Sequence, residues 1–295
     1  MNKKNIRSNR KKYIKSAIVL LIVIALLLFC SYQNRHLETT YYTYKAEHLD
    51  AEFDGYRIVQ ISDLHNAKFG KDNQKLVDRI RECEPDMIVL TGDLVDSNHT
   101  NVDRAVQFVD EIVKICPVYY VTGNHEYWLE ASEYDELMSG LADAGVVILD
   151  DQVVEISRGD AKFRLVGLDD RSLSDGTLGT LLNDQAGQKE ETADNENSEK
   201  KEFTVVLAHE PQYLARYASA GVDLVLSGHA HGGQFRLPFV GGIVTPDQGF
   251  FPEYTAGEYY MDSTEMIVSR GLGNSVIPVR LFNYPEIVCV ELVGK

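Results

Sequence analysis

The sequence predicts an α/β layered domain that follows a single N-terminal membrane-spanning helix. Residues 57–62, 87–90 and 118–121 are short apolar runs, and polar residues follow each of them. The first two runs lead into segments whose apolar residues recur at helical spacing. This alternation of strand and helix is typical of layered α/β domains. Ligands bind such sheets at the carboxyl ends of the strands, so the polar strand ends are the expected place for a site.

The N-terminal helix is predicted from a basic segment followed by an apolar one. Residues 1–30 contain seven Lys or Arg and no acidic residue, and Ala17 to Cys30 are continuously apolar. With its flanks, the segment 13–32 reaches the roughly 20 residues that a span needs. The positive-inside rule keeps residues 1–12 cytoplasmic and leaves the rest of the chain outside the cell membrane. A signal peptide, cleaved to release a secreted protein, is the alternative, although no A-x-A-like site follows Cys30.

Composition limits the classes of partner. The chain has 295 residues, 44% of them hydrophobic, which suffices for one large domain or at most two. Seven of the 29 Lys and Arg residues lie in the first 30 positions, so the remainder holds 22 basic against 45 acidic residues. A body with this excess of negative charge argues against nucleic acid as a partner. The four cysteines form no CxxC pair; buried thiols are expected, and a Cys83–Cys116 bridge stays open.

The rest of the chain divides into a connector and one globular domain. Residues 33–55 form a connector that leads into an edge strand, and 56–295 form the domain. Residues 184–202 have almost no apolar content and are expected to be a flexible, acidic insertion. Residues 235–262 are rich in Gly, Pro and aromatic residues and indicate a long loop with short strands. Further helices are expected at 72–82, 102–113 and 132–144, and further strands at 146–149, 162–167, 203–208, 224–226, 266–269 and 287–292.

Five strand-like runs end in Asp, Asn or His. The polar sets are Asp63 with His65, Asp93, Asn124 with His125, His209, and His229 with His231. The last pair lies in GHAHGGQ, whose glycines allow a sharp turn. Taken alone, this stretch fits a surface turn as well as it fits a metal site. Five such ends together favour a metal site, since O and N ligands suit Mn, Fe and Zn. They are enough for two divalent ions, with Asp93 as the natural bridge and a hydroxide as nucleophile.

The order of these motifs resembles the calcineurin-like metallophosphoesterases. The motifs are DxH at Asp63, GDxxD at Gly92, GNHE at Gly123, the lone His209, and GHxH at Gly228. The resemblance spans roughly residues 56–292 outside the insertion and implies a four-layer αββα sandwich. The chain also resembles one subgroup of this family, the membrane-associated bacterial phosphoesterases, in its GGQ after GHAH and in its ending SRGLGNSVIPVRLFNYPEI. Some members of this subgroup are similar to UDP-2,3-diacylglucosamine pyrophosphatases.

The resemblance also implies residue roles. His125 would act beside the substrate phosphate as a general acid or a positive charge, and Asp96 would hydrogen-bond and orient it. Asp93 would bridge the two ions. One ion would be held by Asp63, His65 and His231, and the other by Asn124, His209 and His229.

Four further residues carry weaker expectations. Arg270 and Asn274 lie in a Gly-flanked loop and could contact the phosphate. Glu126 either orients neighbouring groups or is a surface or cap residue. Trp128 either lines the site or packs in the core.

The expected function is therefore a metallophosphoesterase that cleaves a phosphoester or pyrophosphate bond by attack of metal-bound hydroxide. Its substrate would be a phosphorylated small molecule, a lipid-linked phosphate or a wall polymer, with the membrane contacted through the N-terminal helix. A UDP-2,3-diacylglucosamine hydrolase-like substrate would normally be met on the cytoplasmic face, which conflicts with the predicted topology. The alternative is a non-catalytic metal-binding envelope scaffold on the same fold, which would need neither His125 nor Asp96. The oligomeric state is not predicted.

Overall fold

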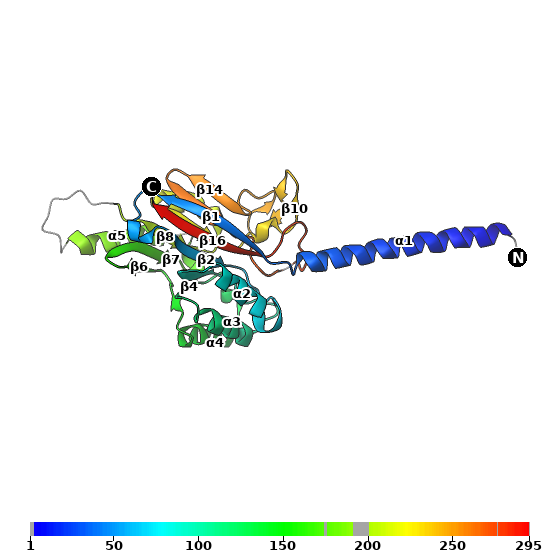
Figure 1. Ribbon diagram of the computed structural model, residues 1–295, viewed down its shortest axis with the longest axis horizontal. Coiled ribbons are helices and arrows are strands. Elements are labelled where there is room, and N and C mark those ends of the chain that lie inside the picture. Colours follow the sequence, from blue (N-terminus) through cyan, green and yellow to red (C-terminus); the bar gives the residue numbers. More distant parts are fainter. Residues whose placement is uncertain (1–2, 174–175, 191–200, 276, 295) are drawn as a thin grey trace.

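A long N-terminal helix projects from one end of the folded domain (Figure 1). The computed structural model describes residues 3–173, 176–190, 201–275 and 277–294. Helix α1 runs over Lys3–Gln33. Its segment Lys12–Gln33 has a mean hydropathy of 2.7, is not buried, and is long and apolar enough to cross a membrane. A helix was predicted here over 13–32; a signal sequence passes the same test, and the orientation stays a prediction.

The first sheet has six strands in the order β1-β16-β2-β3-β4-β5. Strands β2 to β5 run parallel, β16 is antiparallel to β2, and β1 lies at the edge, parallel to β16. The connector therefore does lead into an edge strand. The bounds are β1 (Glu38–Ala46), β16 (Glu286–Gly294), β2 (Tyr56–Ile61), β3 (Met87–Thr91), β4 (Val118–Val121) and β5 (Val147–Ile148).

The second sheet also has six strands, in the order β14-β15-β9-β8-β7-β6. Its four central strands run parallel, and an antiparallel partner closes each edge. The two edge strands are not predicted individually from the sequence, because a half-exposed edge strand carries no continuous apolar run. The bounds are β14 (Gly257–Met261), β15 (Thr264–Val268), β9 (Leu224–Ser227), β8 (Thr204–Leu207), β7 (Ala161–Gly167) and β6 (Gln152–Arg158).

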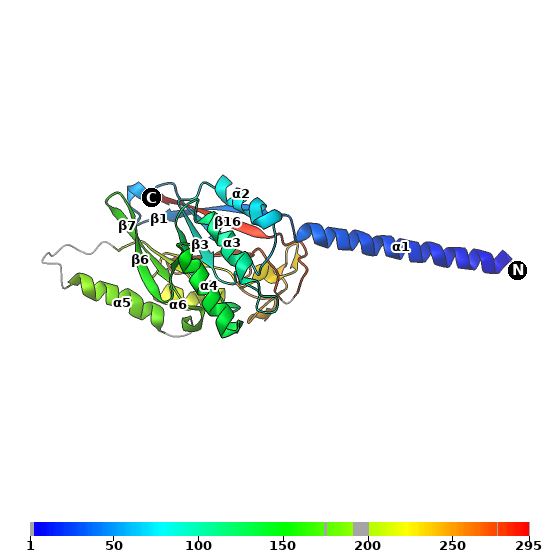
Figure 2. The same cartoon turned by 90° about the horizontal axis from the view of Figure 1, so that it is seen from below.

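Helices cover the outer face of each sheet, which gives the four layers (Figures 1 and 2). Helices α2 (Gln74–Glu82), α3 (Val102–Ile112) and α4 (Ala131–Asp143) pack on the first sheet, and α5 (Thr177–Glu190) and α6 (Leu214–Ser219) on the second. In β3, Ile88 and Leu90 face the helices, whereas Met87 and Val89 face the other sheet. The strands are thus buried on both faces, as their continuous apolar runs require. The αββα sandwich is confirmed.

Two details differ from the expectations or refine them. Residues 184–190 of the expected insertion continue α5, while 191–200 lie outside the described residues. Helix α5 was not predicted because two glycines interrupt its sequence and weaken the helical pattern. All four cysteines are free thiols, so no Cys83–Cys116 bridge forms.

The long loop region forms two small hairpins near the end of α1 that joins the domain (Figures 1 and 2). They comprise β10 (Arg236–Leu237) with β11 (Gly241–Gly242), and β12 (Val244–Thr245) with β13 (Gly249–Phe250). Short 3-10 turns occupy Ala51–Phe53, Lys71–Asn73, Glu126–Trp128, Asp170–Ser172, Pro211–Tyr213 and His231–Gly233.

Candidate metal centre

The polar ends of β2, β3, β4, β8 and β9 meet at one edge of the sandwich. The turns that follow the strands are unusual, because several of these polar residues adopt a left-handed backbone, which non-glycine residues rarely do. These are Asp63, His65, Asp93, His229 and His231, with φ of 51°, 44°, 54°, 64° and 46°. Such conformations turn consecutive side chains toward a common point.

One group of side chains comes from β2 and the turn after β9. Nε2 of His65 lies 3.2 Å from Nε2 of His231. Nε2 of His231 lies 3.6 Å from Oδ1 of Asp63. All three residues are buried.

A second group comes from β4, β8 and β9. Nε2 of His209 lies 3.2 Å from Oδ1 of Asn124 and 3.2 Å from Nδ1 of His229. Nδ1 of His229 in turn lies 3.1 Å from the same Asn124 oxygen. Each group therefore presents its donor atoms to a shared small volume.

Asp93 stands between the two groups. Its Oδ2 atom lies 3.4 Å from Nε2 of His65 and 3.3 Å from Nε2 of His209. Its Oδ1 atom accepts a hydrogen bond of 2.9 Å from the backbone N–H of His125. One carboxylate oxygen is thus within reach of both groups.

These separations fit divalent ions. Ligands 2.0–2.2 Å from a tetrahedral ion are about 3.4 Å apart, close to the distances within each group. Among the described residues, five sets of three possible ligands have their atoms within 4.8 Å of one another, and three of these sets lie at the centre: Asp63, His65 and His231; Asp93, His209 and His229; and His65, Asp93 and His125. The first two sets are those expected from the sequence. The third shows that His125 also lies near enough to be counted as a ligand.

The protonation states suit the first group to metal binding. Burial lowers the pKa of His65 to about 3, against the attraction of Asp93. Burial, together with the charge of Arg280, also holds the pKa of His231 well below its usual value. Both imidazoles are therefore neutral and keep a lone pair for an ion.

The Asp93–His209 pair behaves differently. Burial acts to raise the pKa of Asp93, but His209 and His65 hold it well below the usual value. Burial acts in the opposite sense on His209, yet Asp93 raises its pKa well above normal. The two side chains therefore form an ion pair, and a divalent cation held here would take the place of the proton on His209.

Glycines in the motifs allow this close approach. A Cβ atom at Gly123 would collide with Oδ1 of Asp93, and one at Gly228 would collide with Oγ of Ser62. The backbone after β4 and β9 can reach the centre only without side chains there.

His125 has different partners from those expected. Its Nδ1 atom lies 3.2 Å from the backbone N–H and 3.1 Å from Oγ of Ser97, and its Nε2 atom lies 3.0 Å from Oγ of Ser275. Within the described residues no hydrogen bond joins it to Asp96, whose carboxylate instead accepts the backbone N–H of Asn98 at 2.8 Å. The expectation that Asp96 orients His125 is corrected: the turn after β3 directs Asp96 back onto its own backbone.

Glu126 is buried and organises two of the turns. Oε2 accepts the backbone N–H groups of Asp93 at 2.9 Å and Gly123 at 2.7 Å. Oε1 accepts those of Leu94 at 2.9 Å and Val95 at 3.4 Å. Burial, and then Asp93, raise the pKa of Glu126, while the backbone donors lower it. Because N–H donors face both oxygens, this geometry accommodates the ionised carboxylate. The residue is thus an orienting group rather than a surface cap.

Trp128 lies on the surface beside the site. Its side chain is exposed, and its ring centroid is 4.7 Å from that of His125. The alternative of core packing is therefore wrong.

Arg270 and Asn274 are engaged in structural contacts. Nη2 of Arg270 lies 2.8 Å from a carboxylate oxygen of Glu38 and 2.8 Å from one of Glu286. Oδ1 of Asn274 accepts a hydrogen bond from Nε of Arg280 at 3.1 Å. Two carboxylates neutralise Arg270, so these contacts do not support the expected role at the phosphate.

Asp247 is a residue that the sequence analysis missed. Its Oδ2 atom lies 2.9 Å from Nε2 of His229, on the opposite side of the ring from the second group. A carboxylate on the remote nitrogen of a metal-binding histidine fixes the ring and its tautomer. An Asp in a loop eighteen residues from its histidine gave no sequence signal.

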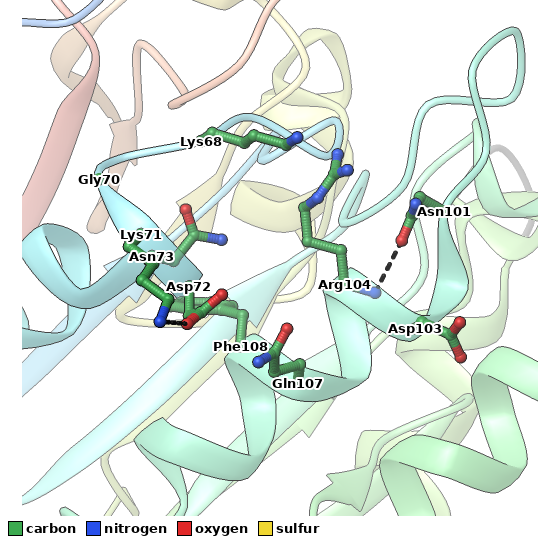
Figure 3. A pocket seen from close by; sticks show the side chains of 10 residues that line it. All are labelled: Lys68, Gly70, Lys71, Asp72, Asn73, Asn101, Asp103, Arg104, Gln107 and Phe108. Carbon is green, nitrogen blue, oxygen red and sulfur yellow. Dashed lines mark hydrogen bonds and ion pairs between the residues drawn. The ribbon is translucent and has the colours of Figure 1, made fainter.

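A pocket of about 490 Å³ opens beside the turn that follows β2 (Figure 3). Its basic side chains are Lys68, Lys71 and Arg104, and Figure 3 shows Lys68 and Arg104 pointing toward one another across it. Nη1 of Arg104 donates to the carbonyl of Asn66, the neighbour of His65, at 3.0 Å. Asp72 and Asp103 also line the pocket, so its three basic side chains leave a small excess of positive charge beside the turn that carries His65.

Known proteins are similar in sequence to this chain. A family model described as calcineurin-like phosphoesterase matches residues 56–233. The uncharacterized metallophosphoesterase YkuE of Bacillus subtilis is 32% identical, over 90% of this chain and 88% of its own. An uncharacterized metallophosphoesterase of Aquifex aeolicus is 34% identical, over 88% of this chain and 95% of its own. The phosphodiesterase YaeI of Escherichia coli is 29% identical, over 81% of this chain and 82% of its own.

Proposed function

The chain belongs to the calcineurin-like phosphoesterase family, and from this premise we propose that it hydrolyses a phosphodiester of a lipid or cell-envelope molecule. As a member of this family it is a metallophosphoesterase that uses two divalent metal ions. The assignment of individual ligands, the diester and its carrier are the proposal. The candidate ions are Mn, Fe and Zn.

The observation that carries the ligand assignment is the position of Asp93. Its Oδ2 atom is within 3.4 Å of His65 and 3.3 Å of His209, so one carboxylate can serve both ions. Asp63, His65 and His231 complete one ion's ligands, and Asn124, His209 and His229 complete the other's. Two divalent ions held by these residues would stabilise the charge of the phosphate oxygens and activate water as the nucleophile near neutral pH.

The chain's own groups orient the reaction. Glu126 holds the two turns that carry Asp93 and Asn124, since its carboxylate accepts four backbone N–H groups. Asp247 fixes the ring of His229 through its Nε2 atom. His125, held by Ser97 and Ser275, can give a proton or positive charge to the leaving oxygen.

Three observations support the substrate class. The similarity to YaeI, which is named a phosphodiesterase, favours a diester. The apolar helix α1 would hold the domain at a membrane, where lipid-linked and envelope phosphates are found. Lys68 and Arg104 in the neighbouring pocket would attract the anionic part of such a substrate.

The test is a turnover assay on the full chain, purified in detergent and loaded with Mn²⁺, Fe²⁺ or Zn²⁺ in turn. Wild type should hydrolyse bis(p-nitrophenyl) phosphate faster than p-nitrophenyl phosphate. Asp93→Asn should lose both activity and bound metal. The matched control is Asp78→Asn, which removes an exposed carboxylate on α2 and should change neither. Equal activity in wild type and Asp93→Asn would refute the proposal, and a preference for the monoester would refute the diester.

A further inference from the structure

An exposed apolar surface lies at the end of the domain where α1 joins it. It consists of two loops, 237–251 and 277–285, and we call it the apolar rim. Phe250 and Phe251 have 77% and 71% of their surface exposed, and Phe239 is fully exposed. The remaining exposed members are Leu237, Val240 and Phe282. Contiguous apolar patches of this kind mark a protein or membrane contact.

The rim differs from the rest of the domain in charge. Residues 237–251 contain one charged side chain, Asp247, and its carboxylate is paired with His229. The residues after position 30 carry a large excess of acidic side chains. The exposed surface of the rim therefore carries a single charge, the Asp247 carboxylate beside His229, because Arg280 in the second loop is buried. An apolar face with so little charge on such a body suits contact with a bilayer.

Part of the rim lies level with the last turns of the apolar segment that is proposed to span the membrane. The ring of Phe282 contacts that of Phe29, with centroids 5.7 Å apart. Phe29 belongs to the apolar segment Lys12–Gln33, four residues before its end. At the helical rise per residue this is about 6 Å inside the segment. If α1 spans the membrane, Phe282 is therefore below the surface of the bilayer.

The join between α1 and the rim is built from specific contacts. Nδ2 of Asn34 donates to the carbonyl of Pro278 at 2.8 Å, and the backbone N–H of Arg280 donates to Oδ1 of Asn34 at 2.9 Å. The rings of His36 and Tyr284 have centroids 4.8 Å apart. The domain cannot tilt freely away from the helix without breaking these contacts.

Both loops of the rim contact the metal centre. In the first loop, Asp247 binds His229, and the backbone N–H of Ile243 donates to the carbonyl of Gly233 at 3.1 Å. In the second loop, Nδ2 of Asn283 donates to the carbonyl of His231 at 2.7 Å. The rim thus borders the site on the membrane side.

Three of the aromatic residues hold strained backbone conformations. Phe239, Phe251 and Phe282 have φ of 68°, 53° and 52°. Bulky residues rarely adopt this region, and such strain tends to mark functional positions.

We propose that the apolar rim inserts into the membrane leaflet from which α1 emerges, so that the metal centre takes a phosphate carried by a lipid headgroup. The bilayer covers the side chains of the rim, and the centre opens at headgroup level. The choice of a lipid substrate rests on the proposed phosphodiesterase function, whereas insertion of the rim rests only on α1 spanning the membrane.

Insertion can be measured without activity. The full chain is placed, one copy per disc, in nanodiscs with plain or brominated acyl chains. Single tryptophans are introduced as Phe239→Trp and Phe250→Trp in a Trp128→Phe background. Each should lose more than half of its emission in brominated lipid, because bromine quenches only on contact. If both variants keep their tryptophan emission in brominated lipid, the proposal is overturned. The same result is expected if a second copy or another protein, rather than lipid, covers the rim.

The matched control for insertion is Tyr260→Trp in the same background. Tyr260 is exposed on β14 and pairs with Glu265, which is opposite Leu224 at the start of β9. It therefore lies at the far end of the second sheet from the metal centre and should not be quenched. Equal quenching of this control and of the rim variants would also overturn the proposal.

The lipid substrate is tested by comparing two diesters. The probes are soluble bis(p-nitrophenyl) phosphate and a phosphatidyl p-nitrophenol embedded in the same nanodiscs. A variant with Phe239, Phe250 and Phe251 all replaced by Ser should lose about tenfold or more on the lipid diester relative to the soluble one, because remote binding energy is lost. An equal loss on both would refute the link to a lipid substrate. If wild type cleaves neither diester, the proposed function fails, while the quenching result still decides insertion.

Discussion

Replacing Glu126 by glutamine should disturb both the stability and the metal centre. The Glu126 carboxylate is buried and accepts the backbone N–H groups of Asp93 and Gly123 on one oxygen, and of Leu94 and Val95 on the other. Glutamine has nearly the same shape but presents an amide NH₂ in place of one oxygen. Whichever way the amide is oriented, its NH₂ group faces two backbone N–H groups, and both of these then lack an acceptor.

The size of the effect follows from the number of unsatisfied groups. A buried polar group that loses its partner costs about 1–3 kcal/mol, so two cost about 2–6 kcal/mol. In a domain of this size each kcal/mol lowers the Tm by about 2–4 °C, so the Tm should fall by about 4 °C or more. Because the turns that carry Asp93 and Asn124 relax, bound metal and turnover should fall as well.

The assay is thermal unfolding of the full chain in detergent, with metal analysis of the same samples. The matched control is Glu136→Gln, an exposed position on α4 that should leave both quantities unchanged. A Glu126→Gln protein whose Tm stays within about 1 °C of wild type and which keeps its metal would refute the reasoning.

Three other predictions can be checked on the same protein. His125→Ala should lower kcat by about 10²–10⁴ while metal content stays normal; loss of the metal would instead make His125 a ligand. Removal of metal by EDTA should lower the Tm, since ions at a hundredfold excess over Kd stabilise by about 2.7 kcal/mol, and an unchanged Tm would contradict a folded-state site. Burial, and then Glu258, raise the pKa of Glu265 from 4.5 to about 7. The folded protein binds this proton more tightly than the unfolded chain, so its free energy of unfolding falls as pH rises from 4.5 to about 7. Glu265→Gln should therefore raise the free energy of unfolding by about 1 kcal/mol at pH 8, after allowance for solvent exposure, and leave it unchanged at pH 4. An equal gain at both pH values would exclude the raised pKa as the cause.

Much of the fold was predictable because buried parallel strands are continuous apolar runs. Strands β2, β3 and β4, and helices α2 and α3, were expected within a few residues of their bounds. Edge strands β6 and β14 were not, since one side of an edge strand faces solvent and its pattern is mixed. Helix α5 was missed because its glycines weaken the helical signal.

The sequence predicted which side chains come together at the strand ends, but not which groups each of them contacts. Parallel strands bring their carboxyl ends to one edge, so side chains at those ends meet whatever the details of the turns. Which group each then contacts depends on the turn conformation. The turn after β3 gives His125 the hydroxyl of Ser97 rather than the carboxylate of Asp96. Arg270 is neutralised by Glu38, which lies 232 residues away in the chain.

By itself, the sequence determined the layered fold, the apolar N-terminal helix and the residues that could hold two ions, because these follow from local periodicity and from the chemistry at strand ends. Only the tertiary structure decided that Glu126 is a buried acceptor, that Asp247 supports His229, and that Phe282 meets Phe29. Each of these depends on long-range packing and on left-handed turns, where a side chain's direction is set by neighbours far away in the chain. The close contact between the apolar rim, α1 and the metal centre belongs to this second kind.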